Sequence, residues 1–138
     1  MIRDHFNAVA AQLNTDSVLS GKGSDVVKIG ADGLLARETY WVLMGGEVDA
    51  LRERLAAPQI PEGDAEFWYT LRAVGTSADV VRVALDRAVR ILTTGPLQLA
   101  GRTVAPLQVS GGEVVPDASV RPPMFWGDLT IRVRSSLA

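Results

Sequence analysis

The chain of 138 residues predicts a single domain, residues 1–138, and its 47% apolar and 22% charged residues are ordinary values for a globular protein. The net charge is −2 with both signs mixed along the chain, which argues against a protein that binds nucleic acid by neutralising phosphates. The absence of cysteine excludes a disulfide scaffold, a thiolate zinc site and a cysteine nucleophile. Uncharged stretches are much shorter than the roughly twenty apolar residues of a membrane span, so we expect a soluble protein made inside the cell.

The first third of the chain predicts one helix followed by two short strands. Apolar residues recur at helical spacing over residues 2–14, which indicates an amphipathic helix with one buried face. Gly21-Lys22-Gly23-Ser24 indicates a flexible break. A short strand is expected over residues 26–29, turned by residues 30–33, and a second over residues 39–44, where aromatic and β-branched residues are dense.

The middle of the chain contains one ambiguous segment and one clear strand. Gly45-Gly46 is expected to end the preceding strand. Residues 47–57 have apolar residues at helical intervals but are short for a helix, so helix and extended structure both stay open there, and Pro58 and Pro61 end the segment. Residues 66–74 alternate apolar and polar side chains, which predicts a strand with two usable faces.

A strong helix follows this strand. Residues 76–79 have the form of a capping box, in which the hydroxyl of Thr76 accepts from helix amides and the carboxylate of Asp79 reaches back. Thr94-Gly95-Pro96 ends the helix. The apolar face between these signals consists of Val81, Ala84, Leu85, Ala88 and Leu92.

The last third predicts a hairpin, a long loop and a final strand. The hairpin pairs residues 97–100 with residues 103–109, the loop covers residues 110–123, and the final strand covers residues 129–134. The complete pattern indicates an α+β fold, in which two helices pack on a mixed or antiparallel sheet in the order α-β-β-β-α-β-β.

The residues that could perform catalysis are few and scattered. His5 is the single histidine and lies one residue off the apolar face of the first helix, where a partly exposed structural side chain is expected. Gly21-Lys22-Gly23-Ser24 resembles part of a phosphate-binding loop, but Val26 stands where the dinucleotide pattern needs a third glycine. Three carboxylate pairs lie in polar segments and are expected to be solvated: Glu47/Asp49, Glu62/Asp64 and Glu113/Asp117. We therefore expect no enzymatic activity, no catalytic residue, no cofactor and no metal.

The segment 110–123 is the best candidate for a functional surface. Structureless loops longer than about twelve residues are usually functional or disordered, and this one contains apolar side chains with no evident place in its own core. Of the tryptophans, Trp41 and Trp68 are expected to pack in the core or on the sheet, whereas Trp126 is expected at an interface, where tryptophan is enriched. The predicted interface comprises Val114, Val115, Val120, Met124, Phe125 and Trp126.

The order of these elements and several short sequences within them resemble the tail terminator proteins of long-tailed siphophages, also described as tail-completion or minor tail proteins. The resemblance covers nearly the whole chain, and its motifs are packing and turn sequences. They are Phe67-Trp68-Tyr69-Thr70-Leu71, Val74-Gly75-Thr76-Ser77, Gly101-Arg102-Thr103-Val104-Ala105-Pro106-Leu107, Val115-Pro116-Asp117 and Pro122-Pro123-Met124-Phe125, with Tyr40-Trp41-Val42-Leu43 consistent as well.

The resemblance implies a homohexameric ring in the virion, at the junction of tail and neck, assembled in the host cytoplasm. Such a ring caps the tail tube by contacting the major tail tube protein, ends its polymerisation, and offers a docking surface to the head-completion protein of the neck. DNA would pass through the lumen without specific binding, and no membrane is involved. The resemblance also favours extended structure over residues 45–65.

Two alternatives stay open at this point. The chain could be another component of the head–tail connector, such as a head-closure protein. It could also be a small ligand-binding or enzymatic domain of ferredoxin-like character, whose cleft would lie against the sheet. An enzyme should place convergent polar residues at strand ends, where this chain has Leu, Val and Trp.

Overall fold

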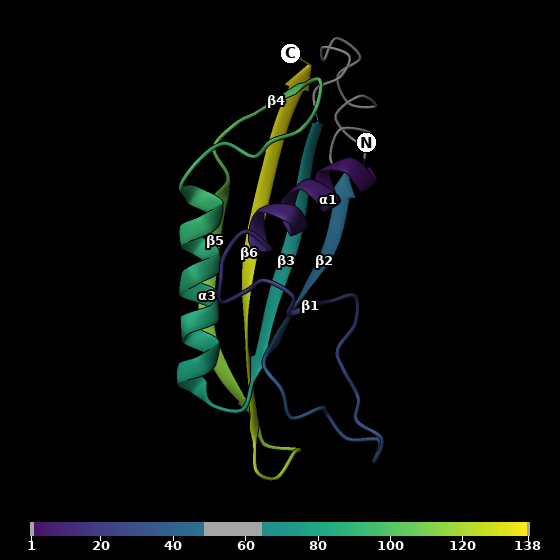
Figure 1. Cartoon of the computed structure of the whole chain (residues 1–138), viewed down its shortest axis with the longest axis vertical. Helices are drawn as coiled ribbons and strands as arrows, with labels where there is room; N and C mark the ends of the chain where they lie inside the picture. The colour runs from purple at the N-terminus through teal and green to yellow at the C-terminus, as the bar shows by residue number, and fades with distance from the viewer. Residues whose placement is uncertain (1, 49–64, 138) are drawn as a thin grey trace.

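The computed structural model describes residues 2–48 and 65–137 and confirms the α+β class. The choice between helix and extended structure for residues 49–57, and the effects of Pro58 and Pro61, lie outside the described residues. Figure 1 shows the elements, which run in the order α1 (Ile2–Leu13), β1 (Gly23–Ser24), β2 (Tyr40–Val48), β3 (Ala65–Gly75), α3 (Ala78–Thr93), β4 (Arg102–Val104), β5 (Gln108–Asp117) and β6 (Met124–Leu137). The predicted order of elements is confirmed, with β4 as a further short strand.

The six strands form a single mixed sheet in the order β1-β2-β3-β6-β4, and β5 also pairs with β6. The short β1 runs parallel to β2, and every other pairing is antiparallel. Both helices lie on the same face of this sheet, with α3 alongside the strands and α1 crossing them (Figure 1). The other face of β3 and β6 carries no helix among the described residues, and we call it the open face.

Alternation along β3 divides its side chains between the two faces. Phe67, Tyr69 and Leu71 are buried against the helices, whereas Trp68 and Arg72 point to the open face. This confirms the strand with two usable faces. The apolar face predicted for α3 is also confirmed, because its buried residues are Val81, Ala84, Leu85, Ala88 and Leu92.

The predicted long loop over residues 110–123 is wrong for most of its length. Residues 108–117 form β5, which pairs with β6 as the first strand of a hairpin. Only a short connection remains between the two strands. The register shifts between Gly111 and Val114, and both Gly111 and Gly112 have positive φ angles, of 108° and 107°. A bulge of this kind adds residues to one strand and interrupts its alternation, so the sequence loses the period that identifies a strand.

The hairpin predicted over residues 97–109 is also wrong. Residues 97–100 form no strand, and the turn at Gly101 places β4 beside the C-terminal end of β6. β4 therefore pairs with β6 instead of with residues 97–100, and β5 pairs with β6, the strand that follows it in the chain. Sequence spacing does not reveal the pairing of β4, because its partner is the distant C-terminal end of β6.

Two expectations near the N-terminus need correction. The flexible break at residues 21–24 contains β1, whose Gly23 pairs with Trp41, while the strand expected over residues 26–29 is limited to one isolated bridge between Ile29 and Leu35. An added Cβ at Gly23 would lie 2.8 Å from the Trp41 ring, so glycine leaves room for the indole to pack against this strand. The expected stop at Gly45-Gly46 is a bulge, and β2 continues through it to residue 48.

The N-terminus of α3 begins one residue later than the capping-box pattern predicts. Ser77, not Thr76, has the extended backbone of an N-cap, and its hydroxyl accepts a hydrogen bond of 3.2 Å from the Val80 amide. We expect Ser77→Ala to lower the free energy of unfolding by about 1 kcal/mol, because a helix amide loses its acceptor. Thr76→Ala is the matched control and should change it by less than about 0.5 kcal/mol. Urea denaturation of both variants checks this, and an equal loss in both would contradict the assignment.

Candidate functional site

The open face of the sheet carries a cluster of paired arginine and tryptophan side chains. Arg72 on β3 donates two hydrogen bonds to the opposing Asp128 carboxylate, at 2.8 and 2.9 Å. Its guanidinium also lies over the Trp126 ring, 4.3 Å from the centroid. The hydrogen bond with Asp128 raises the pKa of Arg72 above its ordinary value, so this cation keeps its charge at any physiological pH.

A second set of the same kind lies further along the two strands. Arg132 on β6 lies over the Trp68 ring at 5.1 Å, forms an ion pair with Glu66, and donates to the Gln108 side-chain oxygen at 3.3 Å. Trp68 is 38% exposed, although it is held from one side by Arg132. Tryptophan and arginine are the residues that dominate binding energy at protein interfaces. The open face therefore offers two ordered Arg–Trp pairs to a partner.

The structure places the predicted interface residues mainly inside their own domain. Val120 and Met124 are buried in a small cluster with Tyr40, Val42 and Val74 at one end of the open face. Val114 and Phe125 pack against the main core on the other side of the sheet. The argument that the apolar residues of 110–123 lack a place in their own core is therefore wrong, because the fold supplies one.

Of the predicted interface residues, Val115 and Trp126 share the open face, where they lie opposite one another in the pairing of β5 with β6. The interface role of both stays a prediction.

Trp41 and Trp68 differ in exposure, and the sequence prediction did not distinguish them. Trp41 is buried in the core and donates from its indole to the Leu19 carbonyl at 2.9 Å, whereas Trp68 is exposed. The alternation of β3 was the available signal, since it puts Trp68 on the same face of the strand as Thr70 and Arg72.

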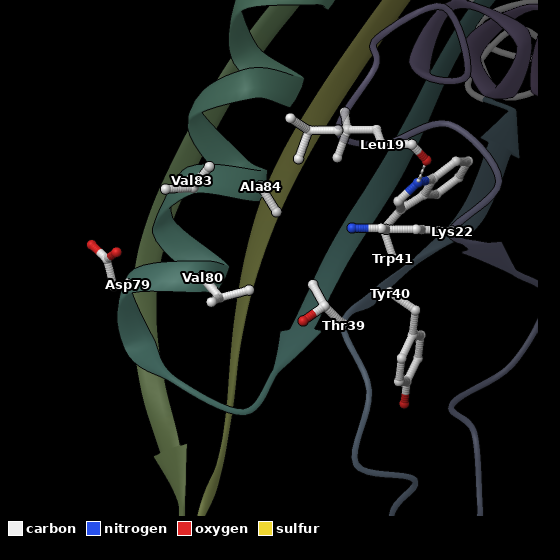
Figure 2. Close-up of a pocket in the computed structure, with 10 residues that line it drawn as sticks. Leu19, Lys22, Thr39, Tyr40, Trp41, Asp79, Val80, Val83 and Ala84 are labelled. Carbon is white, nitrogen blue, oxygen red and sulfur yellow. Dashed lines mark hydrogen bonds between the residues drawn. The ribbon is translucent and has the colours of Figure 1, made fainter.

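An apolar groove lies on the opposite, helix-bearing side of the molecule. Figure 2 shows Val80 and Ala84 projecting from α3 towards Leu19 and Thr39. Its volume is about 140 Å³, and its walls come from the first turns of α3, residues 18–22 and the start of β2. Val80 and Val83 remain 37% and 45% exposed. A cavity of this size and character can accept an apolar group about as large as benzene.

The groove depends on an anchored turn between α1 and β1. The Asp16 carboxylate accepts hydrogen bonds from the amides of Val18 and Leu19, at 2.8 and 3.3 Å, and pairs with Arg87 of α3 at 3.0 Å. These contacts fix Leu19, whose carbonyl in turn holds the Trp41 indole. The turn and α3 are thereby connected across the inner end of the groove.

Asp16 should make the stability of the protein depend on pH. Burial alone would raise its pKa, but the hydrogen bonds from Val18 and Arg87 outweigh burial and hold it below the ordinary 3.8. Because the folded pKa is the lower one, the stabilisation is present above about pH 4 and is lost as the pH falls through the folded pKa. We expect Asp16→Asn to destabilise the protein near neutral pH, and the difference from wild type to shrink in acid. A difference that stays constant from pH 7 to pH 3 in denaturation curves would contradict this.

Residues 25–38 form a projecting segment, which we call the arm, and Figure 1 shows it extending away from α3. The backbone of Lys28 pairs with Ala36, the Gly30 amide donates to the Leu34 carbonyl at 2.6 Å, and a bridge joins Ile29 to Leu35. Three large aliphatic side chains of the arm face solvent: Val26, Ile29 and Leu34 are 65%, 60% and 55% exposed. An ordered turn that exposes this much apolar surface indicates a contact site.

Two of the candidates for chemistry, His5 and Asp117, make contacts within the fold. His5 is buried, not partly exposed as expected, and its Nε2 lies 2.6 Å from the Ser135 hydroxyl while its ring packs on Phe67. Of the carboxylate pairs, Asp49, Glu62 and Asp64 lie outside the described residues. The Asp117 carboxylate accepts from the Ser119 amide and organises the β5–β6 turn. Within residues 2–48 and 65–137, no group of three potential ligands could hold a metal ion.

The described helices include none that is long and apolar enough to span a membrane.

Comparison with known proteins identifies a shared fold. No protein-family profile matches the chain, and no characterised protein matches it in sequence. Among solved structures, the fold is similar to a chain in the virion of a native gene transfer agent particle, with a TM-score of 0.65. The match covers 94% of this chain and 92% of the other, at 19% sequence identity. The two chains therefore share a fold over nearly their whole length.

Proposed function

We propose that this chain is a structural virion protein that caps a phage-like tail tube as a homohexameric ring. In this role it ends polymerisation of the major tail tube protein and provides the surface on which the head-completion protein of the neck docks. The similarity of fold to a chain of a gene transfer agent virion carries the proposal, because it extends over nearly all of both chains. The resemblance of the sequence to tail terminators supports the same role independently of that structure.

The surfaces of the molecule agree with a function by contact. The open face presents aromatic and guanidinium groups, and the arm presents aliphatic groups. The apolar groove lies on the helix-bearing side of the sheet. A subunit in a ring needs one surface for each neighbour and further surfaces for the tube below and the neck above. We propose the open face, with Trp68 and Trp126, as the contact for the tube or the neck. DNA passes through the lumen without specific binding, in keeping with the net charge of −2.

Electron microscopy of particles tests this proposal. Tails from cells that make the chain should end in a sixfold ring, and the ring should be missing in its absence. Trp68→Ala should reduce attachment of the ring to tube or neck while the purified variant keeps its fold, as measured by circular dichroism. If rings of Trp68→Ala and of Trp126→Ala both attached to the tube and neck as well as wild-type rings do, the open face would not be the contact surface. A ring found one layer nearer the head would favour the head-closure role.

A further inference from the structure

We infer that the arm of one subunit docks in the apolar groove beside α3 of a second copy of this chain. The inference rests on the proposed function, in that a ring requires each subunit to contact its neighbour through two different surfaces. The arm and the groove are two apolar features of the same chain that other described residues leave uncovered. One is convex and projects from the body, and the other is concave.

The arm of a subunit does not reach the groove of the same subunit. Its root is fixed on the open face, where Leu35 packs against the small cluster, and Arg37 donates to the Pro122 carbonyl at 2.8 Å. The Lys28 amide also donates to the Tyr40 hydroxyl at 2.9 Å. The groove lies on the helix side, where Leu19 and Ala84 belong to the main core. Tyr40, which holds the root of the arm, also lines the groove, but the arm extends from there away from α3 (Figure 1), so an arm that fills a groove comes from another molecule.

The sizes and polarities of the two surfaces match. The groove, at about 140 Å³, has room for one aliphatic side chain of the arm, and Ile29 is the candidate nearest the middle of the exposed segment. Val80 and Val83 are partly exposed residues of the groove wall, so that Val26 or Leu34 can lie against their outer side. The contact would then cover the most exposed aliphatic residues of both surfaces.

Charge favours the same pairing. Lys22 on the wall of the groove takes part in no ion pair among the described residues, and neither do Asp25 and Asp32 of the arm. The arm's own cation Lys28 is already paired with Glu38 at 2.9 Å. The groove wall also carries the Asp79 carboxylate, so the charge match is confined to Lys22, which can pair with Asp25 or Asp32 of the arm.

A contact of this kind joins two different patches, so it propagates from copy to copy and either closes into a ring or continues as a filament. Closure at a fixed number of copies is the outcome that fits the proposed cap. Each groove in a closed ring is filled by the arm of the preceding subunit, and each arm fills the groove of the next.

Cross-linking tests the contact cleanly because the natural chain has no cysteine. The variant Ile29→Cys/Val83→Cys is treated with a short bifunctional maleimide, both as purified protein at high concentration and in isolated particles. We expect a ladder of covalent multimers on a denaturing gel that stops at one size. The matched control, Ile29→Cys/Thr130→Cys, puts the second thiol at an exposed position of the open face and should give no ladder.

A second measurement does not depend on the cysteines. Val83→Asp should weaken self-association on the order of tenfold, measured by analytical ultracentrifugation, because it puts a carboxylate into the apolar contact. Leu137→Asp, at another exposed aliphatic residue, on β6, should leave association unchanged. Both positions are exposed, so the fold should persist and can be checked by thermal denaturation.

The outcomes separate this contact from the proposed function. The absence of a ladder in both purified protein and particles would overturn the inference, as would cross-linking within single chains or capture of another virion protein at Val83→Cys. A ladder in purified protein, together with normal tails in cells that lack the chain, would support the contact and refute the tail-capping function.

Discussion

Replacing Phe67 with alanine should lower the free energy of unfolding by about 3–5 kcal/mol. Phe67 has no solvent exposure, packs on the His5 ring with centroids 4.3 Å apart, and stacks on Tyr69 in the centre of the main core. Its removal leaves a cavity between β3 and α1 that backbone strands on both sides prevent from closing. The measurement is urea denaturation followed by circular dichroism.

The neighbouring residue on the same strand is the matched control. Trp68→Ala removes a larger side chain from the open face, where it is 38% exposed, so it should cost about 1 kcal/mol or less. Its effect should appear in assembly. If Trp68→Ala destabilised the isolated subunit as much as Phe67→Ala, the two faces of β3 would be assigned wrongly, and the open face would be part of the core.

Replacing Gly111 with alanine should cost on the order of 2–4 kcal/mol. The φ angle of Gly111 is +108°, a conformation that side chains rarely adopt, and an added Cβ would lie 2.6 Å from the Asp128 carbonyl oxygen. The bulge would have to open, which breaks the pairing of β5 with β6. Hydrogen exchange should show the loss of protection concentrated in residues 108–117.

Gly95→Ala is the matched control, because Gly95 lies in open space with no positive φ, and it should change stability by less than about 0.5 kcal/mol. Equal, small effects of both substitutions would mean that residues 110–117 do not form the bulged strand. They would also restore the long loop that the sequence alone predicts.

The elements with an uninterrupted period were predictable from sequence, and those with an interrupted period or a remote partner were not. Residues 78–93 repeat their apolar side chains at helical spacing, and residues 67–73 alternate between buried and more exposed side chains, so each pattern identifies its own structure. In β5 the glycine pair shifts the register and Pro116 resembles a loop residue. The partner of β5 is the next strand, β6, but the interrupted period and the proline make the segment look like a loop, so the hairpin is missed.

The same distinction applies to the candidate surfaces. Alternation along β3 contains the signal that places Trp68 on the polar face, since both of its neighbours are apolar, although the prediction treats Trp68 and Trp41 alike. The groove was beyond prediction, since it forms where residues 18–22, the start of β2 and α3 meet. Only residues 26–29 of the arm are predicted as a strand, and that prediction fails because these residues form a single bridge, between Ile29 and Leu35.

The length of tail tubes in particles made without this chain tests the central claim most directly. If the chain caps the tube, its deletion should give overlong tubes of variable length that carry no head, and expression of the chain in trans should restore uniform tails with heads. Electron micrographs provide both the length distribution and the fraction of tails joined to heads. Tails of normal, uniform length in the deletion strain, whether or not they carry heads, would contradict the tail-capping function.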